Sequence, residues 1–264
     1  MYNFNYHQAK SVDDATKLLT GVEEGKLMAG GMTLIPTLKQ RLAKPSDIVD
    51  LGKIADLKGI KKDGNNIVIG AMTRHFDVAN SDVVKSAIPA LAYLAGHIGD
   101  PAVRNRGTIG GSIANNDPAA DYPSSVLALN ATIVTNKRKI AGDDFFKGLF
   151  ETALEEGEII TGVSFPIPEK AAYMKFPNPA SRYAIVGVFV AKTGGNVRVG
   201  VTGAGPVAYR QKDYEAALAK SFTPDAIKGI VQKDTGLNSD IHASAEYRAH
   251  LVNVMARRAV TAAG

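Results

Sequence analysis

The chain has 264 residues, of which 45% are hydrophobic and 22% are charged, as in an ordinary globular protein. Its net charge of +5 is a small excess of 31 basic over 26 acidic residues, which does not favour a nucleic-acid-binding face. Because the chain has no cysteine, disulfides, cysteine-type zinc sites and iron–sulfur clusters are excluded within it.

The amino-terminal segment lacks the basic and apolar regions of a signal peptide. The longest apolar run, residues 184–191, is far too short to span a bilayer. We therefore expect a cytoplasmic protein without a membrane span. Its length allows one large domain or two to three subdomains.

A small α/β unit is predicted for the first block of the chain. Ser11 is typical of a helix N-cap. A short strand over 26–29 leads into the glycine pair 30–31, a helix follows from Thr33, and residues 47–51 return as a strand. This order places the Gly-Gly loop at the carboxyl end of a strand, where α/β sheets usually bind ligands.

A second block begins near Ile54 and ends at the prolines 166 and 168, which mark a boundary. Its predicted elements are a strand over 65–71, helices over 73–80, 89–97 and 124–129, a strand pair beginning with 131–135, and a last strand over 159–165. Residues 104–123 are predicted to form a loop, because they are dense in glycine, small polar residues and spaced aspartates.

The third block is predicted to be a separate α+β unit. Two β-rich runs, 185–193 and 197–203, are joined by Gly-Gly, which is a strong hairpin signal. Thr223 is expected to cap one helix, and Ser244 a longer one that ends at Arg258.

The first Gly-Gly loop, Ala29 to Thr33, presents backbone N–H groups and the positive end of a helix dipole to an anion such as a pyrophosphate. The same residues are also compatible with a plain turn between a strand and a helix. They match neither the G-x-G-x-x-G dinucleotide pattern nor a P-loop.

The second Gly-Gly pair, Gly110 and Gly111, lets a backbone approach a ligand closely. Thr108 and Ser112 could bond phosphate oxygens, and Asp121 could accept from ribose hydroxyls. Two such segments in separate blocks indicate a long nucleotide cofactor held between them.

Several other residues leave alternatives open. Arg104 and Arg106 could bind phosphates, pair with local carboxylates or face a partner protein. Tyr183, on the junction with the third block, could stack on a flat ring or pack in the interface. His242 and His250 would lie ~12 Å apart along one helix, too far for one metal ion.

Four segments carry a resemblance to a known family: Ala29–Pro36, Gly99–Gly111, Asp117–Asp121, and the ending from Glu246 through Arg258. In these segments the chain resembles the FAD-binding medium subunit of molybdenum hydroxylases. That group includes aerobic carbon monoxide dehydrogenase and the xanthine dehydrogenases. The likeness extends along essentially the whole chain.

The resemblance implies an α+β fold in three parts. Two α/β subdomains of the vanillyl-alcohol-oxidase type, over residues 1–55 and 56–168, would clasp FAD. A C-terminal α+β domain of the carbon monoxide dehydrogenase flavoprotein type, with a small antiparallel sheet and helices, would occupy 169–264.

The resemblance also implies roles for individual residues. The 29–33 loop would bind the pyrophosphate, residues 108–112 would complete that site, and Asp121 would hold a ribose or ribityl hydroxyl. The cofactor-binding residues implied are Ala29, Gly30, Gly31, Met32, Thr33, Ile98 near the isoalloxazine, Thr108, Gly110, Gly111, Ser112, Asp121, Ile160 near the adenine half, Lys175 beside the flavin ring, and Tyr183 against it. Met32 replaces a polar residue of many relatives, and Ser112 an asparagine. No catalytic residue and no metal ligand is implied.

The function implied is that of an oxidoreductase subunit. FAD in this chain would take electrons from two [2Fe-2S] clusters in a small subunit and pass them to an external acceptor, while a large subunit would carry the molybdenum cofactor. The assembly expected is a dimer of heterotrimers. The alternatives are a stand-alone FAD-dependent oxidoreductase and an apo assembly subunit, the latter disfavoured by Gly110, Gly111 and Asp121. Nicotinamide, quinone and oxygen all remain open as acceptors.

Overall fold

A parallel three-stranded sheet, in the order β1-β3-β2, forms the first unit of the computed structural model, which describes residues 1–264. Its elements are β1 (Asn5–Gln8), α1 (Val12–Thr20), β2 (Gly25–Met28), α2 (Leu34–Lys39) and β3 (Asp47–Asp50). Ser11 begins α1 as predicted, because its hydroxyl accepts a hydrogen bond from the Asp14 N–H at 3.0 Å. The edge strand β1 is not predicted by the sequence pattern, since it is polar and mostly exposed.

The second unit is built on an antiparallel sheet in the order β4-β5-β10-β6-β7. Its strands are β4 (Ile60–Asp63), β5 (Asn66–Gly70), β6 (Thr132–Thr135), β7 (Lys139–Ala141) and β10 (Ile160–Pro166). Between β5 and β6 the chain forms the helices α3 (His75–Asn80), α4 (Asp82–Ala87), α5 (Pro89–Gly96), α6 (Pro101–Arg106), α7 (Ile109–Asn115) and α8 (Tyr122–Ala128). Shorter elements complete the unit: η1 (Ala55–Leu57), α9 (Gly142–Phe145), β8 (Phe146–Gly148) and β9 (Glu151–Thr152). The helix expected from Thr73 begins instead at His75, because the Thr73 hydroxyl donates to the Gly59 carbonyl.

A four-stranded antiparallel sheet, in the order β11-β12-β13-β14, forms the third unit. Its elements are β11 (Lys170–Pro177), β12 (Ala184–Thr193), β13 (Asn196–Thr202), β14 (Tyr209–Arg210), α10 (Lys212–Lys220), η2 (Pro224–Ile227) and α11 (Ala245–Ala263). The predicted hairpin is confirmed, with positive φ at Gly194 and Gly195. Ser244 caps α11 as predicted, but the helix continues beyond Arg258, and the helix expected at Thr223 is only a 3-10 turn.

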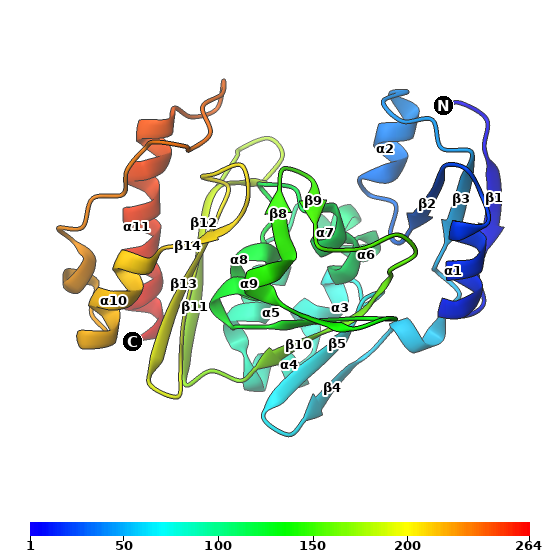
Figure 1. Ribbon diagram of the computed structural model, residues 1–264. Coiled ribbons are helices and arrows are strands. Elements are labelled where there is room, and N and C mark those ends of the chain that lie inside the picture. Colours follow the sequence, from blue (N-terminus) through cyan, green and yellow to red (C-terminus); the bar gives the residue numbers. More distant parts are fainter.

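The sheet of the third unit lies between two hydrophobic cores, and β12 contributes to both (Figure 1). Val186 and Val188 pack with α11 in one core, while Phe189 and Tyr173 of β11 pack in the core of the second unit. Alternate side chains of a strand point to opposite faces, so a strand buried on both faces is apolar throughout. The second and third units therefore share a continuous interior.

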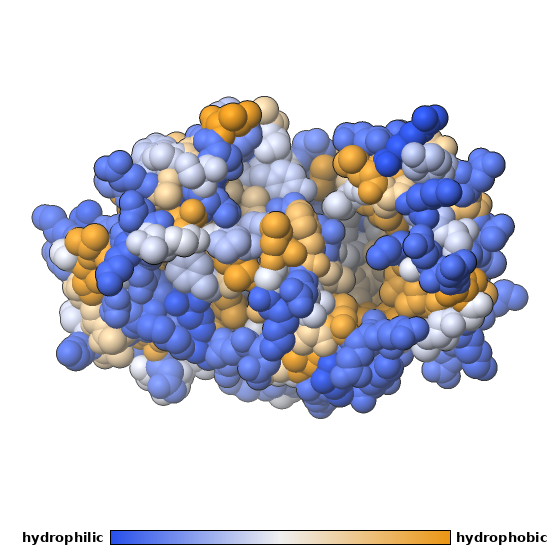
Figure 2. Space-filling view, turned by 45° about the horizontal axis from the view of Figure 1, so that its top comes forward, coloured by the Kyte–Doolittle hydropathy of each residue, from blue (hydrophilic) through white to orange (hydrophobic).

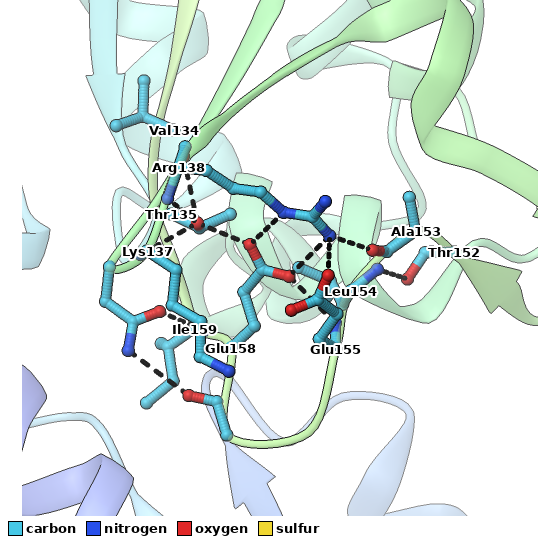
Figure 3. A network of polar contacts seen from close by, with 12 residues as sticks. Val134, Thr135, Lys137, Arg138, Thr152, Ala153, Leu154, Glu155, Glu158 and Ile159 are labelled. Carbon is cyan, nitrogen blue, oxygen red and sulfur yellow. Dashed lines mark hydrogen bonds and ion pairs between the residues drawn. The ribbon is translucent and has the colours of Figure 1, made fainter.

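An ion pair between buried Glu158 and the more exposed Arg138 holds the segment 153–158 of the second unit in place (Figure 3). The side chain of Glu158 is fully buried and accepts hydrogen bonds from Arg138 Nε at 3.0 Å and the Thr135 hydroxyl at 2.7 Å. Chiefly because of the hydrogen bond from Arg138, the pKa of Glu158 is lowered to about 2. Glu158 is therefore ionised at neutral pH.

The same segment supports the first unit. Asn136 Nδ2 donates to Thr16 Oγ1 on α1 at 3.1 Å, and a Cβ at Gly157 would lie 2.8 Å from the Thr20 methyl group. The surface is hollowed between the lobe of the first unit and the rest of the molecule, and apolar residues gather around this hollow (Figure 2). The segment held by Glu158 thus contacts α1 of the first unit, which borders the hollow.

A second polar cluster joins the second unit to the third. Asp143 of α9 pairs with Arg198 of β13 and with Arg210 of β14, the latter at 2.9 Å. Arg198 also donates to the Leu127 carbonyl at 2.7 Å, and Arg210 pairs with Glu215 of α10.

None of the helices is both long and apolar enough to cross a membrane.

Candidate functional site

The first Gly-Gly loop, residues 29–33, connects the carboxyl end of β2 to α2, which begins at Leu34. The six successive backbone N–H groups from Ala29 to Leu34 donate no hydrogen bond within the chain. Gly31 has a φ of +75°, which glycine adopts freely, and its carbonyl accepts from the Ile35 N–H at 2.9 Å. Successive unpaired N–H groups form an anion-binding arrangement, because each is a donor that still needs an acceptor.

The helix contributes less to this loop than we expected. Thr33 occupies the N-cap position, but its hydroxyl makes no capping hydrogen bond. The helix α2 has only six residues, so its dipole is small. Any anion held here would be held mainly by the N–H groups of the loop.

The prediction of a loop over 104–123 is wrong, because most of this segment is helical. Asp100 begins α6 by accepting from the Val103 N–H at 3.0 Å. Thr108 begins α7 in the same way, accepting from the Gly111 N–H at 3.2 Å. These two N-caps initiate helices in a segment whose composition is typical of a turn.

The N–H groups at the start of α7 are already used within the chain. The Ile109 N–H donates to the Thr73 carbonyl and the Gly110 N–H to the Ala71 carbonyl, at 3.1 and 2.9 Å. Gly111 and Ser112 donate to Thr108. The Ser112 hydroxyl, in contrast, makes no hydrogen bond in the chain, so it is the polar group that this turn offers to a ligand.

The close approach expected of Gly110 is to the protein itself. A Cβ at Gly110 would lie 2.6 Å from the Cβ of Ala71, so the missing side chain allows α7 to pack on the end of β5. The contact is thus structural, and it positions the neighbouring Ser112.

The structure brings the two Gly-Gly segments together. A Cβ at Gly30 would lie only 2.0 Å from the Arg106 carbonyl oxygen, and one at Gly111 would lie 3.4 Å from the Cβ of Ala29. The first Gly-Gly loop therefore lies directly against the turn between α6 and α7. The unpaired N–H groups of the loop and the Ser112 hydroxyl belong to one region of the surface.

A buried polar cluster lies around Asp121, just before α8. The Oδ1 atom of Asp121 accepts from the Tyr173 hydroxyl at 2.5 Å and pairs with Lys175 Nζ at 2.8 Å. Lys175 also donates to the His97 carbonyl at 2.7 Å. The Oδ2 atom of Asp121 has no partner in the chain, although the residue is only 4% exposed. One oxygen of this carboxylate is thus held by the protein, and the other is open to a hydroxyl donor.

Burial and charge act in opposite directions on this cluster. Burial raises the pKa of Asp121, while the neighbouring Lys175 and Tyr173 lower it. Burial and the charge of Asp121 raise the pKa of Tyr173 well above its ordinary value. Tyr173 therefore keeps its proton and remains the hydrogen-bond donor.

Arg104 and Asp117 have structural roles within the chain. Arg104 Nη1 donates to the Ile98 and Gly99 carbonyls, each at 3.1 Å, so it braces the turn before α6 instead of meeting a carboxylate. Asp117 Oδ1 accepts from the Ala119 N–H at 2.9 Å in the Asp-Pro turn, and burial raises its pKa. Arg106 has an exposed side chain without a hydrogen bond or ion pair in the chain.

The remaining residues implied by the resemblance differ in accessibility. Ile98 is partly buried against the core of the second unit, and Ile160 is 5% exposed within it. Met32 and Tyr183 are accessible, with 36% and 45% of their surface exposed. A direct side-chain contact with a ligand is therefore open to Met32 and Tyr183, whereas the side chain of Ile160 is used by the core.

Sequence reasoning missed Tyr173 altogether. This residue lies in β11, 52 positions after the Asp121 to which it donates, and no local pattern links the two. The sequence of β11 has no regular alternation of apolar and polar residues, so its pattern indicates neither the buried position of Tyr173 nor its partner.

Two protein families match this chain, one over the first two units and one over the third. Residues 2–168 match the family described as FAD binding domain in molybdopterin dehydrogenase. Residues 171–263 match the family described as CO dehydrogenase flavoprotein C-terminal domain.

Relatives align over nearly the full length. The chain is 36% identical to the glyceraldehyde dehydrogenase medium chain of Sulfolobus acidocaldarius, over 97% of this chain and 96% of that one. It is 35% identical to the carbon monoxide dehydrogenase medium chain of Hydrogenophaga pseudoflava, over 98% and 96%. The structure of reconstituted CO dehydrogenase from Oligotropha carboxidovorans superposes with a TM-score of 0.91 at 34% identity, covering 99% of this chain and 98% of that one.

Proposed function

This chain belongs to the family of FAD-binding medium subunits of molybdenum hydroxylases, and from that premise we propose that it is the electron-transfer subunit of such a complex. Its first domain is an FAD-binding domain, and its relatives are oxidoreductase subunits. The molybdenum cofactor and the iron–sulfur clusters belong to other subunits in complexes of this kind. The absence of cysteine agrees with this division, since iron–sulfur clusters are held by cysteine thiolates.

The run of six unpaired N–H groups from Ala29 to Leu34 carries the proposal. A pyrophosphate offers several anionic oxygens, and donors without a protein acceptor are what such a group needs. We assign the pyrophosphate of FAD to Ala29–Leu34. The Ser112 hydroxyl, across the contact between Gly30 and Arg106, completes the site.

The Asp121 cluster supports the same assignment. Its unpartnered Oδ2 atom suits a ribose or ribityl hydroxyl, which is a donor that a carboxylate accepts readily. We assign the flavin half of the cofactor to the neighbourhood of Ile98, Lys175 and Tyr183. Tyr183 is accessible enough for its ring to lie against a flat ligand. The residues present therefore fit FAD, although each of these contacts stays a proposal.

Bound FAD would supply the redox chemistry, taking electrons from the [2Fe-2S] clusters of a small subunit and passing them to an external acceptor. The residues of this chain would bind the cofactor, orient it and exclude water from one side of it. We propose a large molybdenum-cofactor subunit and a small iron–sulfur subunit as partners, in a dimer of heterotrimers. A cytoplasmic location and the division of the FAD-binding domain near residue 55 stay predictions.

The test is to purify the chain alone and together with its partner subunits, and to measure visible spectra and flavin content. We expect a yellow protein that binds one FAD per chain and is reduced by the substrate of the complex only when the partners are present. A colourless protein that does not bind added FAD would refute the flavoprotein assignment. Reduction by a small substrate without partners would instead identify a stand-alone oxidoreductase.

A further inference from the structure

The C-terminal domain reaches into the FAD-binding domain through two residues of one strand. Tyr173 and Lys175 are two positions apart on β11, so their side chains share a face of the strand. Both contact the same oxygen of Asp121, at 2.5 Å from the Tyr173 hydroxyl and 2.8 Å from Lys175 Nζ. An oxygen with two donors is fixed in direction, and the second oxygen of the carboxylate then points elsewhere.

All the members of this contact are buried. Tyr173 is 1% exposed, Asp121 is 4% exposed, and the Lys175 side chain is 6% exposed. Polar groups removed from water are costly unless they are paired, so their arrangement is held firmly once it is formed. Asp121 Oδ2 is the atom that remains without a partner in the chain.

The neighbouring strand has a gap that accommodates the phenol. A Cβ at Gly187 of β12 would lie 2.4 Å from the Tyr173 hydroxyl oxygen and 3.0 Å from the ring carbon that carries it. The Tyr173 ring also stacks on Phe189, with centroids 6.1 Å apart. Tyr173 therefore reaches Asp121 only because position 187 has no side chain.

We propose that Tyr173 is a positioning residue for the cofactor, which acts through Asp121 by holding one carboxylate oxygen so that the other faces a cofactor hydroxyl. This inference rests on the proposed binding of FAD. It makes the FAD site a joint product of both domains, since the residue that orients Asp121 comes from the C-terminal one. Lys175 contributes the second restraint and, through the His97 carbonyl, ties the turn that carries Ile98 to the same strand.

The central experiment measures FAD binding to the full chain stripped of cofactor, by quenching of flavin fluorescence. Tyr173→Phe removes one hydroxyl and keeps the ring in its stack. Because Asp121 then keeps only Lys175 as a restraint and can turn away from the cofactor hydroxyl, we expect binding of FAD to weaken by about tenfold. Tyr214→Phe is the matched control, since the buried Tyr214 hydroxyl bonds Asn253 in the C-terminal core, away from Asp121. It should alter thermal unfolding while leaving FAD affinity within about twofold of wild type.

A double-mutant cycle separates positioning from general loss of stability. In an Asp121→Asn background, Tyr173→Phe should weaken FAD binding by no more than about twofold further, because the two residues act as one unit. Gly187→Ala should imitate Tyr173→Phe by displacing the hydroxyl, and its effect should shrink when the hydroxyl is already absent.

The outcomes are distinct. If a folded Tyr173→Phe variant binds FAD as tightly as wild type does, this inference is overturned and the proposed function stays intact. Equal effects of Tyr173→Phe with and without Asp121 would also overturn it. Failure of the wild-type chain to bind FAD would overturn both proposals.

Discussion

The replacement of Gly30 by alanine is the sharpest perturbation of the proposed pyrophosphate site. The added Cβ would lie 2.0 Å from the Arg106 carbonyl oxygen and 2.9 Å from the Gly107 Cα. Ordinary van der Waals contact begins at 3.4 Å, so the two backbones would have to separate by about 1.4 Å. Both atoms met by the Cβ belong to backbone, which cannot rotate away as a flexible side chain would.

The expected loss of affinity follows from that displacement. Overpacking of this kind costs about 1–3 kcal/mol, which corresponds to about 5- to 150-fold in a dissociation constant. The cost falls on FAD binding because Gly30 carries one of the unpaired N–H groups and Arg106 begins the turn that leads to Ser112. A shift between the two segments moves the donors of one relative to those of the other.

This loss is measured by titrating the Gly30→Ala chain, freed of cofactor, with FAD and monitoring flavin fluorescence. Gly229→Ala is the matched control, because a Cβ at that exposed position meets no atom within 4 Å and its φ is not positive. Thermal unfolding of both variants checks that they are folded. A folded Gly30→Ala chain that binds FAD within about twofold of wild type would refute the assignment of the loop.

Three further predictions concern stability. The pKa of Glu158 is lowered from 4.5 to about 2, so its ionised form stabilises the fold above pH 4.5 and this contribution disappears towards pH 2. Calorimetry should therefore show that the Tm of Glu158→Gln falls less steeply between pH 4.5 and 2 than the Tm of wild type. An equally steep fall in both proteins would contradict a stabilising ion pair. Burial lowers the pKa of His75 from 6.5 to about 4, so the unfolded chain gains a proton first as the pH falls. Between pH 6.5 and 4, urea unfolding should therefore show wild type losing up to about 3 kcal/mol more of its unfolding free energy than His75→Gln, and equal losses would contradict this reasoning. Asp143→Asn should lower the unfolding free energy by about 1 kcal/mol, since two arginines lose their shared carboxylate, whereas the exposed neighbour substitution Asp144→Asn should leave urea unfolding unchanged.

Local signals predicted much of the fold. Ser11 and Ser244 begin helices, and the glycine pair at 194–195 forms a hairpin, because caps and turns depend on residues a few positions apart. The loop predicted from composition over 104–123 is wrong, because Asp100 and Thr108 cap two helices that cover much of this range. Glycine-rich sequence does not favour helices, so composition alone did not indicate them.

The candidate site could be predicted only in part. The unpaired N–H groups of the first Gly-Gly loop agree with what a strand, a glycine pair and a helix indicate. The N–H groups of Ile109 and Gly110, in contrast, are bonded to carbonyls of Thr73 and Ala71, far back in the chain. Tyr173 is likewise joined to Asp121 by folding alone, so neither partner marks the other in the sequence.

The contribution of β11 and β12 to the core of the FAD-binding domain has a consequence for synthesis on the ribosome. Tyr173, Phe189 and Ala191 belong to the interior of the FAD-binding domain, yet they are translated after residue 168, where that domain's own sequence ends. At the usual pace of elongation, their codons are read over about 1–5 s, and during that time the newly made domain exposes an apolar face to solvent. During this interval, chaperones or other nascent copies of the chain compete for that apolar face. The competition ends when β11 and β12 are available to cover it.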